Sequence, residues 1–159
     1  ATCLLDLQVY GAGRRELLDW CRAQQVACRI RCRPSENTSI WLGPALGLDI
    51  ATLMAGQEGT LADFAQPCDL VLGYDVPTSG LFDLLDQGQP VLQALCRRLA
   101  PEEARIVDAR IVPHLPLADA LARLTSFCAQ ASSLWDFAQR QRREHAQAML
   151  AAQPLRAWL

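Results

Sequence analysis

The chain has 159 residues, of which 51% are hydrophobic and 20% charged, and its formal net charge is −2. This length suits one domain with a buried core, and the charge balance gives no indication of a nucleic-acid or anionic-membrane partner. No apolar run reaches the roughly 20 residues of a membrane-spanning helix, and no signal peptide is recognisable.

The seven cysteines stand singly along the chain, without a CxxC pair. An odd number of scattered cysteines is typical of reduced thiols, so we expect a cytoplasmic protein in which most cysteines are small core residues. The sequence starts at Ala1 rather than Met, directly in a predicted strand. We therefore expect either a piece of a longer protein or a chain that has been trimmed.

The first predicted unit is a strand, a glycine turn and a helix. The strand covers Cys3–Tyr10, the turn is Gly11-Ala12-Gly13, and apolar residues at helical spacing predict a helix over Glu16–Gln25. The Gly-x-Gly sequence also suits a dinucleotide site, but the third glycine of that motif is absent because position 16 is glutamate. We favour a tight turn that opens a helix, and a dinucleotide-dependent enzyme is the alternative.

The second predicted strand, Val26–Cys32, leads into a polar corner. Arg31 and Arg33 stand at its exit, ahead of Pro34 and several hydroxyl and amide side chains. A guanidinium group can pair with phosphate through two parallel hydrogen bonds, so this corner suits an anion. The alternative is that these arginines form the solvent-exposed face of an edge strand.

The next stretch is less regular. Ile40–Leu48 and Thr52–Gly59 are apolar but interrupted by glycine and proline, and we expect one short strand there without assigning its bounds. Thr60–Pro67 predicts a short helix, with Thr60 as its N-cap and Asp63 at the third helical position.

The central unit is a buried strand, a polar turn, a helix and a second strand. The first strand covers Asp69–Tyr74, the turn covers Asp75–Ser79, the helix begins near Leu81 and ends at Gly88, and the second strand covers Val91–Leu95. Side-chain oxygens at positions 75, 78 and 79 can cap the helix. Ligands of open α/β sheets bind beyond the carboxyl ends of the strands, so the 75–80 loop is the best candidate for a binding site.

The remaining chain predicts one more strand and three helices. These elements are a short helix from Pro101, a strand over Arg110–Val112, an amphipathic helix over Leu117–Cys128, and a longer helix to about Ala151 that Ser132 or Ser133 caps.

The central unit resembles the nucleotide-binding domain of GT-B glycosyltransferases, especially bacterial enzymes that build surface polysaccharide. In that family a buried strand ends in a small residue, a Ser/Thr-rich turn follows, and a helix with an acidic residue closes with Gly-Lys-Pro before an apolar strand. The family's Arg-x-His-Pro motif corresponds here to Arg31-Cys32-Arg33-Pro34, in which Arg33 replaces the histidine. The other matching positions hold Gly73, Thr78, Ser79, Asp83 in place of the usual Glu, Gly88-Gln89-Pro90 with Gln89 in place of Lys, and Val91.

The resemblance implies a three-layer, Rossmann-like α/β domain with a mainly parallel sheet, which is one half of a GT-B fold. That domain would cover residues 1–130, and residues 131–159 would form a helical extension on the same domain or on a missing partner domain. The implied function is the donor-binding half of a glycosyltransferase in surface polysaccharide or lipopolysaccharide assembly, with a nucleotide-sugar as substrate. The implied nucleotide-sugar site comprises Arg31, Arg33, Gly73, Thr78, Ser79, Gly80 and Asp83.

The resemblance also implies what lies outside this chain. The catalytic base of such enzymes belongs to the other half, so no catalytic residue is assigned and the chain alone is expected to bind without transferring. The implied partners are a missing N-terminal acceptor domain and, through the full-length protein, the inner membrane as a peripheral contact.

No cofactor or metal is expected, because His114 and His145 have no cysteine or carboxylate at metal-ligand spacing. The alternative function is a non-catalytic α/β binding or oligomerisation module.

Overall fold

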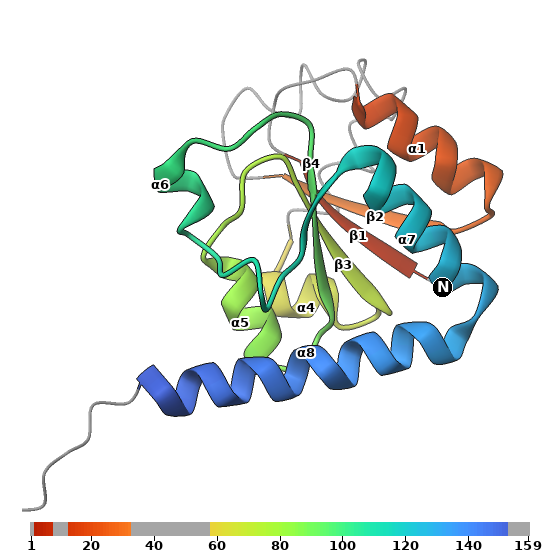
Figure 1. The fold of residues 1–159 in the computed structure, drawn as a ribbon. Helices are drawn as coiled ribbons and strands as arrows, with labels where there is room; N and C mark the ends of the chain where they lie inside the picture. The colour runs from red at the N-terminus through yellow and green to blue at the C-terminus, as the bar shows by residue number, and fades with distance from the viewer. Residues whose placement is uncertain (1, 8–12, 33–57, 153–159) are drawn as a thin grey trace, which may run out of the picture.

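The fold is a parallel sheet covered by helices on both faces (Figure 1). The structure is a computed structural model, and it describes residues 2–7, 13–32 and 58–152. Within these residues, five parallel strands lie in the order β2-β1-β3-β4-β5. The strands are β1 (Thr2–Leu7), β2 (Ala27–Cys32), β3 (Leu70–Tyr74), β4 (Val91–Leu95) and β5 (His114–Pro116). The helices are α1 (Gly13–Ala23), α4 (Leu61–Ala65), α5 (Gly80–Asp86), α6 (Pro101–Ala104), α7 (Leu117–Ala129) and α8 (Ala131–Ala152).

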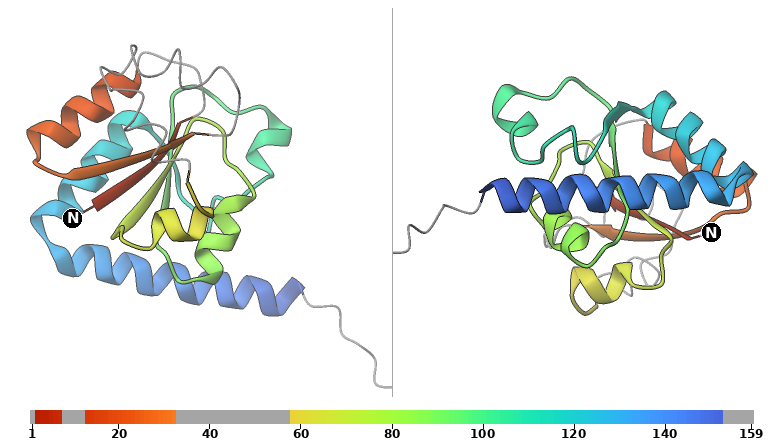
Figure 2. Two further views of the ribbon diagram at one scale, coloured as in Figure 1. Left: turned by 180° about the vertical axis from the view of Figure 1, so that it is seen from behind. Right: turned by 60° about the horizontal axis from the view of Figure 1, so that its bottom comes forward.

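Two apolar clusters, one on each face of the sheet, make up the core. α1 and α7 cover one face, and α4 and α5 cover the other (Figures 1 and 2). Successive residues of a strand point to opposite faces. Leu72 and Tyr74 of β3 therefore join the cluster under α1 and α7, whereas Val71 joins the cluster under α4 and α5. This arrangement confirms the three-layer, Rossmann-like α/β domain with a parallel sheet.

The strand order defines where a ligand can reach the sheet. β1 has β2 on one side and β3 on the other, so the direction of strand addition reverses between β1 and β3. In open parallel sheets this reversal leaves a crevice at the carboxyl ends of the two strands, and ligands bind there. All five residues of β3 are buried, as expected for an inner strand of a parallel sheet.

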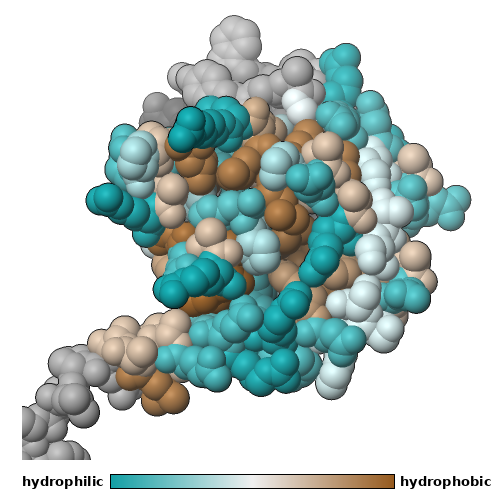
Figure 3. Space-filling view, viewed as in Figure 1, coloured by the Kyte–Doolittle hydropathy of each residue, from teal (hydrophilic) through white to brown (hydrophobic). Residues whose placement is uncertain are grey.

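α8 crosses the amino ends of the strands, opposite this edge (Figure 2). The buried Gln141 side chain accepts a hydrogen bond from Val91 N–H (2.8 Å) and donates to the carbonyls of Val91 (2.7 Å) and Ile111 (2.8 Å). Buried His145 pairs with Asp86 at 2.7 Å. The described part of residues 131–159 therefore packs on this same domain. Side chains over most of α8 are hydrophilic on the face seen in Figure 3.

Two local predictions are wrong. The last strand is not Arg110–Val112 but β5, because the N–H groups of Ile111 and Val112 both donate to the Asp108 carbonyl and fold that segment into a turn. The long helix begins at Ala131 without a serine cap, and the Ser133 hydroxyl donates to the Gln130 carbonyl at 2.7 Å from within the helix.

Other local predictions are confirmed. Thr60 caps α4 in a reciprocal capping box with Asp63, and Gly88 follows α5 with a φ of +75°. Tyr10, Gly11-Ala12 and Ile40–Leu48 lie outside the described residues. None of the described helices combines the length and the apolar character needed to cross a bilayer.

Candidate functional site

The candidate site is the carboxyl edge of the sheet, where the ends of β3 and β4 meet the start of α1. Gly13, the first residue of α1, lies close to the ends of β3 and β4. A Cβ atom added there would lie 2.7 Å from Tyr74 Oη and 3.4 Å from Cys96 Sγ. Glycine at this position therefore lets the α1 N-terminus approach the end of β3. The N–H groups of a first helical turn have no partner within the helix and favour an anion.

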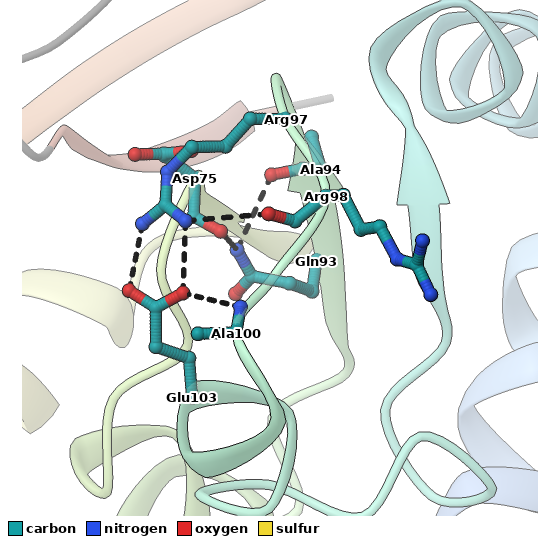
Figure 4. Close-up of polar contacts among 7 residues, drawn as sticks. All are labelled: Asp75, Gln93, Ala94, Arg97, Arg98, Ala100 and Glu103. Carbon is teal, nitrogen blue, oxygen red and sulfur yellow. Dashed lines mark hydrogen bonds and ion pairs between the residues drawn. The ribbon is translucent and has the colours of Figure 1, made fainter.

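Asp75 follows β3 directly and adopts an unusual backbone conformation. Its φ is +70°, a region that costs a non-glycine residue about 1–3 kcal/mol at such positions. The N–H of Asp75 donates to the Ala94 carbonyl at 2.8 Å, and its carbonyl accepts a hydrogen bond from Gln93 Nε2 at 3.2 Å (Figure 4). These contacts hold the start of the 75–80 loop against β4.

The Asp75 carboxylate is buried at this edge, with 7% of its side chain exposed. Its Oδ1 atom lies 3.5 Å from Arg97 Nε and has no hydrogen-bond partner among the described residues. A buried carboxylate oxygen without a hydrogen bond is costly, which makes it a good acceptor for a ligand hydroxyl.

Arg97 stands between Asp75 and Glu103 (Figure 4). Its guanidinium group donates to both carboxylate oxygens of Glu103, at 2.7 and 2.8 Å. Glu103 also accepts a hydrogen bond from Ala100 N–H at 2.8 Å. The bonds from Arg97 and then from Ala100 lower the pKa of Glu103 to about 2, and the same pair raises the pKa of Arg97. Arg97 is therefore held in a fixed orientation at the edge.

Gln93 lies in the middle of β4 and is fully buried. Its amide nitrogen donates to the carbonyls of Asp75 and Ala94, both at 3.2 Å. The side chain occupies the space beside Gly73, where a Cβ atom would collide with Gln93 Oε1. Gly73 is the residue that matches the small residue of the GT-B pattern. Packing against Gln93 is by itself enough to explain a glycine at this position.

The 78–80 bend opens α5 next to Asp75. The N–H groups of Leu81 and Phe82 donate to the carbonyls of Thr78 and Ser79, at 3.1 and 3.0 Å. Ser79 itself is helical, with a φ of −61°, and its hydroxyl makes no capping bond, so the prediction that this hydroxyl caps the helix is wrong. The Ser79 side chain is exposed, as is Asp83 in the first turn of α5.

Arg31 lies at the end of β2, on the other side of β1. Its guanidinium group donates to the carbonyls of Glu58 (3.2 Å), Gly59 (2.9 Å) and Thr60 (3.1 Å), just before α4. A Cβ atom on Gly80 would lie 3.0 Å from Leu61 Cδ2. The first turn of α4 therefore lies between Arg31 and the 78–80 bend.

The predicted site residues thus fall into three groups. Thr78, Ser79, Gly80 and Asp83 lie together at the start of α5, and Gly73 lies one strand position before Tyr74. Arg31 forms the second group. The first turn of α4 separates it from the residues of α5, and its guanidinium group donates to backbone carbonyls before α4. Arg33 lies outside the described residues.

Sequence reasoning missed the importance of Asp75, Arg97 and Glu103. The sequence suggests Asp75 only as a possible helix cap and gives Glu103 no role in the site, whereas the structure joins both carboxylates to Arg97. The available signal was a charged residue just past a buried strand, one position after β3 for Asp75 and two positions after β4 for Arg97.

Two further observations concern metals and histidine. Within residues 2–7, 13–32 and 58–152, no group of three or more His, Cys, Asp or Glu side chains is placed to hold a metal ion. His114, in β5, is half-buried, and burial lowers its pKa while the Asp108 carboxylate partly offsets the effect.

No family model, curated protein or solved structure matches the chain. The functional argument therefore depends on the residues at the carboxyl edge.

Proposed function

We propose that the chain is the donor-binding half of a GT-B glycosyltransferase that acts in surface polysaccharide or lipopolysaccharide assembly. The observation that carries the proposal is the placement of the α1 N-terminus, the buried Asp75 carboxylate and the exposed Ser79 hydroxyl at the carboxyl ends of β1 and β3. This edge is where parallel sheets with a strand-order reversal bind nucleotides.

The diphosphate of a nucleotide-sugar needs hydrogen-bond donors and positive potential. The N–H groups of the first turn of α1, which have no partner within the helix itself, supply both, and the Ser79 hydroxyl adds a neutral donor. In the transfer reaction these groups stabilise the negative charge that develops on the leaving nucleoside diphosphate as the glycosidic bond breaks. Arg31 and Arg33 stand where the resembled family has its Arg-x-His-Pro motif, and we assign them the same role; Arg31 would exchange its carbonyl contacts for phosphate.

The hydroxyl groups of the sugar or ribose need acceptors. The Asp75 carboxylate is fixed and has an oxygen without a hydrogen bond among the described residues. Asp83 is a second carboxylate, on the exposed side of the first turn of α5. We assign the acceptor role to both, and assign the catalytic base to the acceptor half of the enzyme.

The proposal is tested by thermal melting of the chain with UDP, GDP and CMP and with their sugar derivatives. A ligand at about 100 times its Kd stabilises a protein by about 2.7 kcal/mol, which raises the Tm of a chain of this size by about 5–10 °C. We expect such a shift with one nucleotide class. The absence of a shift with all of them would refute the proposal, and a shift with NAD(H) instead would favour the dinucleotide-dependent alternative.

Two variants locate the ligand. Ser79→Ala should leave the Tm unchanged, because the hydroxyl makes no capping bond, but should weaken nucleotide binding by about tenfold. Ser132→Ala, which removes an exposed hydroxyl on α8, is the matched control and should change neither quantity. Asp75→Asn should weaken binding of the nucleotide-sugar more than binding of the free nucleotide. Equal binding by wild type and both site variants would place the ligand elsewhere.

A further inference from the structure

A second concave site lies at the other end of the domain, between α7 and α8. Its volume is about 430 Å³, within the range of small-molecule pockets. α7 runs back from the carboxyl edge, and α8 begins where α7 ends (Figure 1). The site therefore lies away from the carboxyl edge. The lining residues that matter here are Arg123 and Ser126 of α7 and Trp135, Asp136, Arg140 and Arg143 of α8.

Three arginines from two helices line this pocket. In the part of the chain that the structure describes, no hydrogen bond or ion pair engages the guanidinium groups of Arg123, Arg140 or Arg143. Arg97 and Arg110, by contrast, each pair with a carboxylate, at 2.7 and 2.6 Å. The three pocket arginines therefore keep their positive charge without an ion-pair partner in the described part of the chain, although the whole chain has a net charge of −2.

The lining contains one carboxylate, that of Asp136, against these three guanidinium groups. Like charges gathered around one cavity raise the local potential, and an anion inside the cavity lowers the electrostatic free energy. Guanidinium groups favour phosphate, because two N–H donors match two phosphate oxygens. Arg123 is already oriented, since its guanidinium lies over the Phe127 ring at 5.5 Å.

Trp135 adds an exposed aromatic side chain to the same pocket. Its side chain lines the pocket and the residue is 63% exposed, so a large aromatic face meets water beside the arginines. Exposed tryptophan next to cationic groups suits a ligand with an apolar or aromatic part beside its charge. Inorganic phosphate alone would leave that face uncovered.

We propose that the α7–α8 pocket binds a phosphate group that is attached to an apolar or aromatic moiety, with Arg123, Arg140 and Arg143 on the phosphate and Trp135 on the apolar part. Two sources share this chemistry, a soluble aromatic phosphate and the headgroup of an anionic phospholipid. The inference does not rest on the proposed donor site, since no residue is common to the two.

The soluble source is tested by calorimetric titration of the full chain with phenyl phosphate and with inorganic phosphate. We expect phenyl phosphate to bind at least tenfold more tightly than inorganic phosphate and to quench tryptophan fluorescence. Trp135→Ala should abolish both the preference and the quenching. The lipid source is tested by sedimentation with vesicles of phosphatidylglycerol in phosphatidylcholine, with pure phosphatidylcholine as the blank.

The arginine variant decides between this pocket and general charge effects. Arg140→Gln/Arg143→Gln should weaken binding at least tenfold in whichever arm gives a signal. Arg22→Gln/Arg105→Gln removes the same charge from exposed positions outside the pocket and should have little effect. The proposal is overturned if neither phenyl phosphate nor the phosphatidylglycerol vesicles bind. It is also overturned if inorganic phosphate binds as tightly as phenyl phosphate, or if the two double variants lose the same affinity. Binding in the vesicle arm alone identifies the ligand as a lipid headgroup.

Discussion

The most direct test of the fold is the buried amide of Gln141. This side chain, 2% exposed, links α8 to the N–H and carbonyl of Val91 at the start of β4 and to the carbonyl of Ile111. Gln141→Met keeps the length of the side chain and its helix propensity but removes all three hydrogen bonds. A buried backbone group left without a partner costs about 1–3 kcal/mol. With three such groups affected, we expect a loss of at least about 3 kcal/mol, a large fraction of the roughly 5–15 kcal/mol of a typical domain.

The loss is measured by urea denaturation followed by circular dichroism, where the midpoint should fall while the slope m stays constant. Gln147→Met is the matched control, because Gln147 is an exposed residue of the same helix and its change should stay within about 0.5 kcal/mol. If the two variants lose equal stability, the three bonds do not hold α8 in place and the reasoning is wrong.

Three further predictions concern single contacts. Gly73→Ala should lower stability by about 1–3 kcal/mol because the new Cβ displaces the Gln93 amide, and adding Gln93→Ala should recover part of that loss in a double-mutant cycle of thermal melts. The pKa of Glu103 is about 2 in the folded chain against a usual 4.5, so its hydrogen bonds stabilise the fold above pH 4.5 and this stabilisation is lost as the pH falls toward 2. Arg97→Gln should remove the larger part of this pH dependence of the Tm, because the Ala100 N–H bond remains. Thr60→Ala should cost about 1 kcal/mol in urea denaturation, whereas Thr60→Ser should retain most of the capping energy.

Local chemistry made most of the layered fold predictable from the sequence. The apolar run at β3, the capping box of Thr60 and Asp63, and the positive φ of Gly88 each depend on residues within a few positions of one another. β5 was misplaced for the same reason. Arg110–Val112 looks like a strand locally, but the Asp108 carbonyl accepts two backbone hydrogen bonds and turns the chain, so the strand that pairs with β4 starts at His114.

The candidate site was only partly predictable, because its contacts join residues that are distant in the sequence. Asp75 and Arg97 meet because β3 and β4 are neighbours in register and both end at the same edge. The sequence places the 75–80 loop at that edge, but not the Arg97 and Glu103 pair beside it. The role of Arg31 likewise depends on where α4 begins, and its carbonyl contacts with residues 58–60 follow from tertiary structure.

Two buried glutamine side chains, one in α8 and one in β4, connect β4 to elements at both ends of the domain. At the amino end of β4, Gln141 of α8 binds the backbone of Val91. From the middle of β4, the Gln93 side chain donates to the carbonyl of Asp75. Both amides are buried, and a buried amide that loses its partners is costly, so each contact resists displacement of the strand or the loop. Asp75 is thereby held in its φ of +70° by a strand that is itself anchored. A carboxylate fixed in this way loses little conformational entropy when it accepts a ligand hydroxyl, which is the property that the proposed donor site requires.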